Sequence, residues 1–390
     1  MSISNKYVTF DGRTKKPLNE PGKEGWRNLI FVDPDALKDP MAYQASSGLA
    51  AAVNVALTLG MPLLITGEPG CGKSQLAARL VWELGFPQTE PETFVIKSDT
   101  ESRDLFYRFD TLGHFHAAQS SEKNTDPRRF VRFHALGKAI LWAIGKENFP
   151  SSLGDKMLHG TGEDNGLKDW PDKPTRLVVL IDEIDKAPRE VPNDILTEIE
   201  TMKFHVPELG LDAPIGLDMK DTKQAKRHRP VVIITSNGER DLPQAFLRRC
   251  VYWHVDLPDY GYDEKGEVTR TDDGTIYSIV MGRLGVRFDG AGKADNRNKL
   301  LREALSLYRY LRKEAGLKHK PSVAELLNWL EHLSAEAQVR KTKVPQDESL
   351  RSHSRFEGSL TALLKVDEDR IREDEILKEW SRSLAPKSVG

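Results

Sequence analysis

A glycine-rich loop containing one lysine places the strongest constraint on how this 390-residue chain folds. The apolar run Pro62–Thr66 precedes the loop Gly67–Ser74, and the amphipathic segment Gln75–Trp82 follows it. Glycines let consecutive backbone N–H groups curl around phosphate oxygens, and the start of the following helix adds partial positive charge. This strand, loop and helix order predicts a nucleoside triphosphate site. A chance glycine turn is the alternative.

The residue types of the loop suit ATP and Mg2+. Lys73 is expected to neutralise the terminal phosphates, and the hydroxyl of Ser74 is expected to coordinate magnesium. Cys71 is interpreted as a small tolerated residue, although alkylation of its thiol should block nucleotide binding. The residues expected to bind the nucleotide are Gly67, Glu68, Pro69, Gly70, Cys71, Gly72, Lys73, Ser74 and Gln75.

Composition argues against several classes of protein. Lys and Arg number 57 against 59 Asp and Glu, so no global field steers the chain onto nucleic acid or an anionic membrane. Two cysteines, Cys71 and Cys250, and a start without a secretion signal favour a cytoplasmic setting. Residues 47–66 are apolar, but Gly60 and Pro62 interrupt them. We expect a buried helix, a break and a strand there, without membrane insertion.

The alternation of short β-rich runs with amphipathic segments is typical of an α/β fold, with a parallel sheet flanked by helices. In such a sheet, ligands bind at the carboxyl ends of the strands. Three of the expected strands end in polar residues suited to nucleotide chemistry. The expected strands are Leu63–Thr66, Phe94–Lys97, Leu177–Ile181, Val231–Thr235 and Tyr252–Val255.

Five segments are expected along the chain. They are an N-terminal extension at 1–32, a large α/β nucleotide-binding domain at 33–258, a linker at 259–297, a small helical lid at 298–336, and a C-terminal helical extension at 337–390. An insertion at 113–174 holds an irregular polar stretch and the helical segment 133–147. Ser322 and Glu325 form a capping box that begins one lid helix. Terminal helices are expected at 356–364 and 371–380.

Two carboxylates end the third apolar strand. Asp182 is expected to hold magnesium, usually through water, and Glu183 to polarise the water that attacks the γ-phosphate. Ordinary solvation at a sheet edge is the alternative for an isolated acidic strand end. The preceding phosphate loop favours the catalytic interpretation.

Two further features follow. Asn237 comes just after the strand Val231–Thr235. It could orient the attacking water, because an amide donates and accepts hydrogen bonds at once. A loop-capping asparagine is the alternative.

Arg248 and Arg249 form an adjacent pair, and a guanidinium from a neighbouring subunit can stabilise a transferring phosphate. The pattern alone does not separate this role from a solvent-facing one.

In this order, these motifs resemble the AAA+ ATPases of the MoxR-like group, in the helix-2-insert clade. The resemblance covers about residues 33–335 and rests on Leu180–Pro188, Val191–Met202, Thr235–Asn237 and Leu242–Cys250 together with the loop. It implies Walker A at Lys73 and Ser74, Walker B at Asp182 and Glu183, sensor 1 at Asn237, and an arginine finger at Arg249 with Arg248 as the near alternative.

The resemblance also implies partners. It implies a ring of identical subunits, commonly a hexamer, and a client or partner protein, often one with a von Willebrand factor A domain. A hairpin beginning at 203–209 and the insertion near 113–133 are candidates for pore loops or client contacts. The lid departs from the family, because Ser322–Leu333 lacks the sensor-2 arginine and only Lys318 and Lys320 stand close.

Other functions remain open at this point. A nucleotide-gated scaffold with slow turnover is the first alternative, and the missing lid arginine favours it. A nucleic-acid motor is the second, and balanced charge argues against it, although the hairpin loop carries a basic run that we interpret as solvated. The histidine pair His114 and His116 lacks further zinc ligands. The basic run comprises Lys220, Lys223, Lys226, Arg227 and Arg229.

Overall fold

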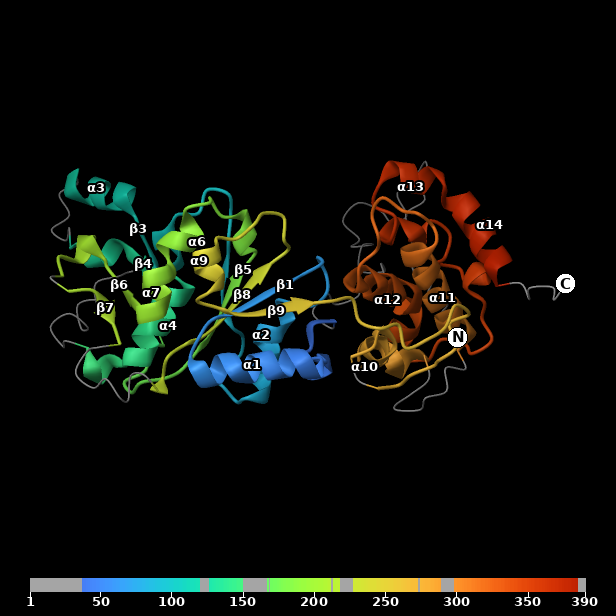
Figure 1. Cartoon of the computed structure of the whole chain (residues 1–390), viewed down its shortest axis with the longest axis horizontal. Helices are drawn as coiled ribbons and strands as arrows, with labels where there is room; N and C mark the ends of the chain where they lie inside the picture. Colours follow the sequence, from blue (N-terminus) through green and yellow to red (C-terminus); the bar gives the residue numbers. More distant parts are fainter. Residues whose placement is uncertain are drawn as a thin grey trace, which may run out of the picture. The chain divides into compact units, whose positions relative to one another are not determined.

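The computed structural model describes residues 37–119, 126–149, 167, 169–211, 213–217, 227–272, 274–288 and 298–384. The chain forms two compact units, which Figure 1 follows in sequence colours. The larger unit spans Ala45–Leu257, and the smaller joins Met1–Gln44 to Pro258–Gly390. The expected N-terminal extension at 1–32 and the basic-run residues Lys220, Lys223 and Lys226 lie outside the described residues.

A parallel sheet forms the centre of the larger unit. Its strands lie in the order β2-β5-β8-β1-β9, and every neighbouring pair is parallel. The predicted α/β class is therefore confirmed, and each expected strand overlaps an observed one. The bounds are β1 Leu63–Gly67, β2 Glu92–Val95, β5 Val178–Asp182, β8 Val231–Ser236 and β9 Val251–Val255.

Helices cover both faces of this sheet. Figure 1 shows α1 and α2 on one side of the strands and α6 and α9 on the other. This double cover explains why the central strands are apolar on both faces, with Leu63, Leu64 and Ile65 fully buried. The bounds are α1 Ser47–Leu59, α2 Gln75–Glu83, α3 Thr111–Gln119, α4 Ala135–Ile144, α6 Val191–Asp194, α7 Leu196–Thr201 and α9 Gln244–Leu247.

The apolar stretch before the phosphate loop divides as the sequence predicts. The Ser46 side chain caps α1 by accepting a hydrogen bond from the Leu49 N–H, at 3.2 Å. Gly60 ends α1 with a left-handed φ of 65°, a conformation that glycine adopts without strain. β1 then begins at Leu63. Across the described ranges, no helix has both the length and the apolar character needed to cross a bilayer.

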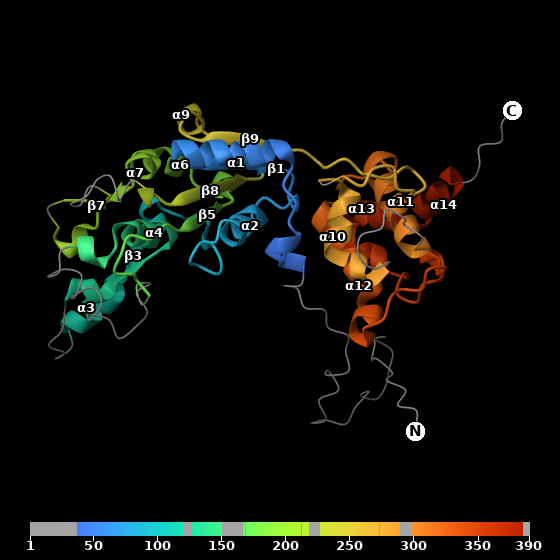
Figure 2. The same ribbon diagram turned by 90° about the horizontal axis from the view of Figure 1, so that it is seen from below.

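Two antiparallel hairpins lie together at one end of the larger unit (Figure 2). β3 Tyr107–Phe109 pairs with β4 Val131–Phe133, and β6 Lys203–Phe204 pairs with β7 Ile215–Gly216. The Phe204 ring stacks on Phe106 at 5.3 Å, and the Tyr107 hydroxyl donates to Glu208 at 3.0 Å. These contacts join the two segments that the sequence singles out as candidate client contacts.

The insertion is more regular than its polar sequence suggests. α3 occupies part of the stretch expected to be irregular, because Asp110 accepts from the Gly113 N–H at 2.8 Å and so supports the first turn. The His114 ring packs against Phe109 and Phe130 with centroids at 5.5 and 5.1 Å. His114 therefore belongs to an aromatic cluster at the base of α3. The short 3-10 helices of the larger unit are η4 Ser102–Leu105, η5 Pro127–Phe130, η6 Lys146–Asn148, η7 Ile184–Lys186 and η8 Pro207–Leu209.

The smaller unit is helical. Trp329 is fully buried in α12, and its Nε1 donates to the Ser359 hydroxyl at 2.9 Å. The predicted capping box of Ser322 and Glu325 is present at the start of that helix. The bounds are η3 Pro40–Ala42, α10 Ile276–Phe288, α11 Lys299–Lys313, α12 Val323–Arg340, η9 Leu350–Ser352, η10 Ser359–Ala362, α13 Asp367–Ile371 and α14 Glu373–Ser383.

Two segments of the smaller unit differ from expectation. The linker expected at 259–297 contains α10, whose Ile276, Val280 and Leu284 are buried at helical spacing. Glycines within α10 lower its helix propensity, so the sequence pattern did not predict this helix. The helix expected at 356–364 is the short η10, because Gly358 adopts a left-handed φ of 70° immediately before it.

Replacing Gly137 by alanine should destabilise the larger unit by about 1–3 kcal/mol, as overpacking does elsewhere. A Cβ at this position of α4 would lie 2.1 Å from the Phe106 carbonyl oxygen, so backbone must move. Urea denaturation followed by circular dichroism would show the loss as a lower transition midpoint.

Gly282→Ala in α10 is the matched control. The nearest atom to its added Cβ would lie at 3.5 Å, an ordinary contact. Alanine exceeds glycine in helix propensity by about 1 kcal/mol, so this substitution should not lower the midpoint. An unchanged midpoint for Gly137→Ala would contradict the close approach of α4 to Phe106.

Candidate nucleotide site

The phosphate loop leaves β1 near the middle of the sheet and enters α2. Gly67 has a φ of 150°, and a Cβ there would lie 2.6 Å from the Val255 carbonyl oxygen of β9. Gly70 and Gly72 have left-handed φ values of 75° and 89°. The glycines are therefore required by backbone conformation and by the close approach of β9.

Lys73 is held inside this loop. Its side chain is buried, and its Nζ donates to the carbonyl oxygens of Gly67 and Glu68 at 2.8 and 2.9 Å. The ammonium group is thus held inside the loop by two of its backbone carbonyls. This position suits a cation that meets terminal phosphates.

Asp182 joins the loop to two further strands. It is the last residue of β5, and its Oδ1 accepts from the Ser74 hydroxyl at 2.9 Å. The same oxygen accepts from the Thr235 hydroxyl of β8. The two predicted magnesium ligands therefore lie together. Carboxylate and hydroxyl oxygens are hard donors that suit Mg2+, which keeps waters and substrate phosphates as its other ligands.

Glu183 lies next to Asn237, as the strand ends predict. The Asn237 Nδ2 is 3.4 Å from Glu183 Oε1, and Lys186 Nζ is 2.7 Å from Glu183 Oε2. Glu183 has a left-handed φ of 62°, which is uncommon for a residue other than glycine. Its N–H donates to the Thr235 hydroxyl at 3.0 Å, which holds this conformation.

Sequence reasoning missed three residues that organise this edge. Thr235 is buried and contacts both Asp182 and the Glu183 N–H. Asp185 is buried and accepts from the backbone N–H groups of Asn237 and Glu239, at 3.2 and 2.9 Å, so it positions the loop that follows β8. Lys186 is the third. A second acid three residues after Asp182 was the available signal for Asp185.

The arginine pair lies at the opposite edge of the sheet. Arg248 and Arg249 follow α9 and precede β9, whereas the phosphate loop follows the carboxyl end of the parallel strand β1. Arg249 Nε is 3.0 Å from Glu200 Oε2, and its Nη1 donates to the Ala245 carbonyl at 3.2 Å. The structure therefore does not bring either arginine to the phosphate loop of its own chain.

Clusters of His, Cys, Asp and Glu side chains are a further kind of metal site. In the ranges that the structure describes, no group of three or more His, Cys, Asp or Glu side chains is placed to hold a metal ion. The Cys71 Sγ lies 3.9 Å from Lys73 Nζ within the loop. Burial raises the pKa of this thiol, although the charge of Lys73 opposes the shift.

Comparison with known proteins supports the architecture. Residues 62–250 match the family model of the AAA domain, dynein-related subfamily. The larger unit has the AAA+ fold. Its parallel five-stranded sheet and phosphate loop are followed along the chain by helices, which completes the predicted fold class.

No curated protein matches this chain. Among solved structures, domain III of the replication initiation protein DnaA from Thermotoga maritima matches with 13% identity and a TM-score of 0.35. That match covers 86% of this chain and 100% of the other.

Iodoacetamide should alkylate native Cys71 more slowly at pH 8 than it alkylates cysteine in an unfolded peptide. The thiolate is the reactive form, and burial raises the pKa of Cys71 above its ordinary value. The rate should therefore rise as pH increases through 9. Cys250, whose pKa burial raises to about 12, should react more slowly still. Mass spectrometry of the labelled peptides measures both rates, and equal rates for Cys71 and the unfolded peptide would contradict this description.

Proposed function

We propose that this chain is an ATP-hydrolysing AAA+ motor of the MoxR-like type, which forms a ring, commonly a hexamer, and remodels or activates a partner protein. One observation carries the proposal. Asp182 contacts Ser74 of the phosphate loop, and the adjacent Glu183 contacts Asn237. The side chains that the proposal needs as cation, metal ligands, base and amide therefore lie together at the carboxyl edge of a single sheet, which supports it.

The chemistry follows from these positions. Lys73 and the loop N–H groups bind the phosphates. Ser74 and Asp182 would hold Mg2+, which would supply positive charge against the phosphate oxygens. Glu183 accepts a proton from water as the water oxygen bonds to the γ-phosphorus, while the bond to the ADP oxygen breaks. Asn237 orients that water. Lys186 keeps the Glu183 carboxylate in place from its other oxygen.

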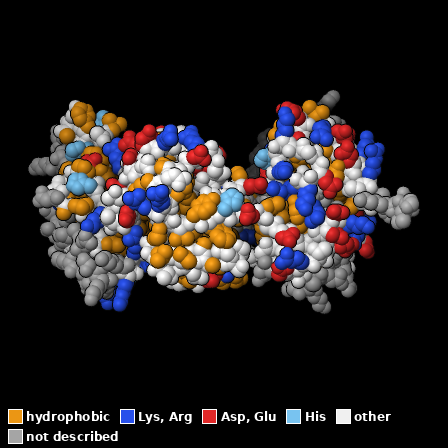
Figure 3. All heavy atoms as spheres, in the orientation of Figure 1, with side chains coloured by type: hydrophobic (Ala, Val, Ile, Leu, Met, Phe, Trp, Pro, Cys, Tyr) orange, Lys and Arg blue, Asp and Glu red, His pale blue; other side chains and the backbone are white. Residues whose placement is uncertain are grey.

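The position of Arg249 supports a ring. A finger at the amino edge of one sheet can meet a phosphate at the carboxyl edge of another only if a second copy supplies it. The outer face of α1 also suits contact between copies, because α1 contains no charged residue and leaves Val55 and Leu59 exposed by 47% and 61%. Figure 3 shows hydrophobic side chains gathered over this part of the larger unit.

The joined hairpins supply a candidate surface for the partner protein. α3 leaves Leu112 and Phe115 exposed by 66% and 55%, beside the β3–β4 pair. Exposed apolar side chains on a structured insertion are suited to polypeptide contact. By resemblance, a partner with a von Willebrand factor A domain is the first candidate.

A nucleotide-gated scaffold with slow turnover is the second candidate function. Lys318 Nζ forms an ion pair with Glu368 inside the smaller unit. Lys318 is thus engaged locally, which leaves Lys320 as the remaining candidate to replace the missing lid arginine. Weak coupling of lid to nucleotide would favour slow turnover.

Nucleic-acid binding through the basic run gains less support. Arg229 is half-buried, and its Nη2 donates to the Ile199 carbonyl at 2.9 Å. This side chain therefore lies against α7 and is not fully open to solvent. Balanced net charge points in the same direction.

Replacing Glu183 by glutamine should lower kcat for ATP hydrolysis by about 100-fold or more, because removing a general base loses about 10²–10⁴-fold. ATP binding should persist, since Lys73, Ser74 and Asp182 remain. Phosphate release and fluorescent nucleotide titration measure the two properties separately. Full hydrolysis by Glu183→Gln would remove the base assignment.

The proposed function is tested by measuring native mass and ATPase rate together, across protein concentration, for wild type and Arg249→Ala. Specific activity should rise as rings form, and Arg249→Ala should lower it by about 10³-fold or more, since a trans arginine contributes about 10³–10⁵. Glu83→Gln, which breaks the exposed Arg79–Glu83 ion pair at 2.7 Å, is the control and should have no effect. ATP-dependent assembly with negligible hydrolysis in wild type would favour the scaffold.

A further inference from the structure

Two arginines lie side by side at the amino edge of the sheet. β5 and β8 pair with Val178 opposite Val231, so Arg176 and Arg229 are cross-strand neighbours just before those strands. Both side chains are half-buried. Burial lowers the pKa of each guanidinium, and the charge of Arg176 lowers the pKa of Arg229 further. Like charges placed opposite each other are destabilising.

These arginines are poorly satisfied by the protein itself. The Nε atoms of Arg176 and Arg229 are buried and have no hydrogen-bond partner in the part of the chain that the structure describes. Among the described residues, Arg229 Nη2 donates to the Ile199 carbonyl in the last turn of α7. A guanidinium offers five donors, so a ligand that reaches these two Nε atoms would gain hydrogen bonds that the described part of the chain does not supply.

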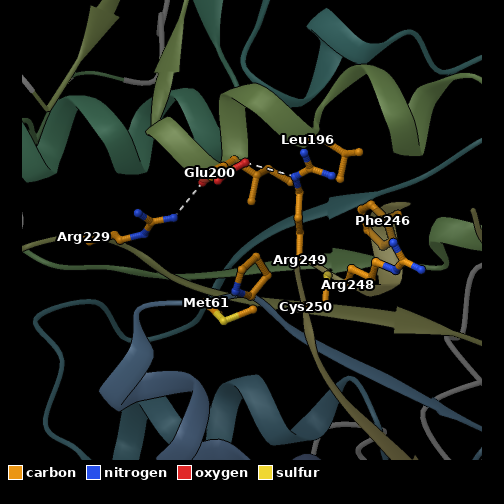
Figure 4. Close-up of a pocket in the computed structure, with 10 residues that line it drawn as sticks. Met61, Leu196, Glu200, Arg229, Phe246, Arg248, Arg249 and Cys250 are labelled. Carbon is orange, nitrogen blue, oxygen red and sulfur yellow. Dashed lines mark hydrogen bonds and ion pairs between the residues drawn. The ribbon is translucent and has the colours of Figure 1, made fainter. Parts of the chain in front are cut away.

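A cavity of about 210 Å3 opens beside Arg229 (Figure 4). Its walls are largely apolar, and the Cys250 thiol among them is neutral because burial raises its pKa to about 12. An apolar cavity of about 150 Å3 accommodates benzene, so this one has room for a ring-sized group. The lining residues are Met61, Pro62, Leu196, Ile199, Glu200, Arg229, Phe246, Arg248, Arg249 and Cys250.

The contacts of Glu200 indicate which kind of ligand these arginines would bind. Its carboxylate lies 3.0 Å from Arg249 Nε, and its charge raises the pKa of Arg229 against the effect of burial. Figure 4 shows Arg249 extended toward Glu200, whereas Arg248 lies beside Phe246. The Glu200 side chain is 63% exposed, so an incoming anion can replace it.

We propose that this cavity binds a compact oxyanion, a carboxylate or phosphate carried on an apolar body about the size of an aromatic ring. The oxyanion bonds to Arg229 and competes with Glu200 for Arg249, while the apolar body enters the cavity beside Phe246 and Cys250. Arg176 adds attraction from the neighbouring strand. The site lies at the opposite edge from the phosphate loop of its own chain, and it shares Arg249 with the proposed function. Probe binding requires neither hydrolysis nor a ring, so the two proposals can fail separately.

The oxyanion has two sources, a free organic anion or an acidic group of a second copy of this chain. Calorimetric titration of the full chain with benzoate and with phenylphosphate tests the first source. Both should bind saturably, and neutral benzyl alcohol should not. Lys73→Ala should bind both probes as wild type does, because the phosphate loop is not the site.

Three substitutions should move the affinity in different directions. Arg229→Met keeps the side-chain length but removes the charge, and should weaken binding about tenfold or more. Glu200→Gln removes the competing charge and should tighten binding about two- to fivefold, as expected for an exposed ion pair. Cys250→Phe should abolish binding by filling the cavity. Glu83→Gln serves as the neutral control for losing an exposed ion pair.

Unfolding midpoints establish that each variant is folded. Arg176→Met relieves the repulsion and should raise the midpoint by about 2–4 °C, which corresponds to about 1 kcal/mol in a unit of this size. It should also weaken probe binding, and it replaces Arg229→Met if that variant does not fold.

The outcomes are distinct. Probe binding that Arg229→Met weakens and Glu200→Gln strengthens assigns the site to a free anion. If no probe binds, native mass is measured; association between copies that salt and Arg229→Met both weaken assigns the oxyanion to the second copy. Absence of both effects overturns the proposal, as does probe binding that Lys73→Ala removes and Arg229→Met leaves intact.

Discussion

The carboxylate of Asp182 holds together the edge on which the candidate nucleotide site depends. It ends β5, accepts from Ser74 after β1 and accepts from Thr235 in β8, so one oxygen aligns three neighbouring strands. A partly buried carboxylate is stable only when such donors surround it. The same threonine also receives the Glu183 N–H. The positions of Glu183, the proposed base, and of Ser74 and Asp182, the proposed metal ligands, are consequently linked.

The two edges of the sheet carry different chemistry. The carboxyl edge holds acids, an amide and the Lys73 loop, whereas the amino edge holds Arg176, Arg229 and the Arg248–Arg249 pair against Glu200. Parallel strands fix this separation, because every strand starts at one edge and ends at the other. A strand of five residues, such as β1, spans roughly 15 Å at about 3.3 Å per residue, so side chains of one copy at the two edges remain apart.

Local chemistry could be predicted from the sequence, and long-range pairing could not. The loop Gly67–Ser74 is contiguous, and β1, β5 and β8 are apolar on both faces, so these elements were visible in the residues. Thr235 is the last residue of the expected strand Val231–Thr235. Only the pairing of β8 with β5 brings it to Asp182. Arg229 belongs to a basic run that suggests a solvated loop, yet it is half-buried against α7. The helix α10 was not predicted because it contains glycines, although its buried positions are regularly spaced.

The segment that ends in α7 runs between these two edges of the sheet. The chain runs from Glu183 through η7 and α6 into α7, and it leaves α7 through Met202, which has a left-handed φ of 51°, directly into β6. The last turn of α7 is held by Arg229 at Ile199 and by Arg249 at Glu200. Both contacts lie within the last turn of this helix, immediately before Met202. The start of the β6–β7 hairpin is therefore tied, through the end of α7, to two arginines at the amino edge of the sheet.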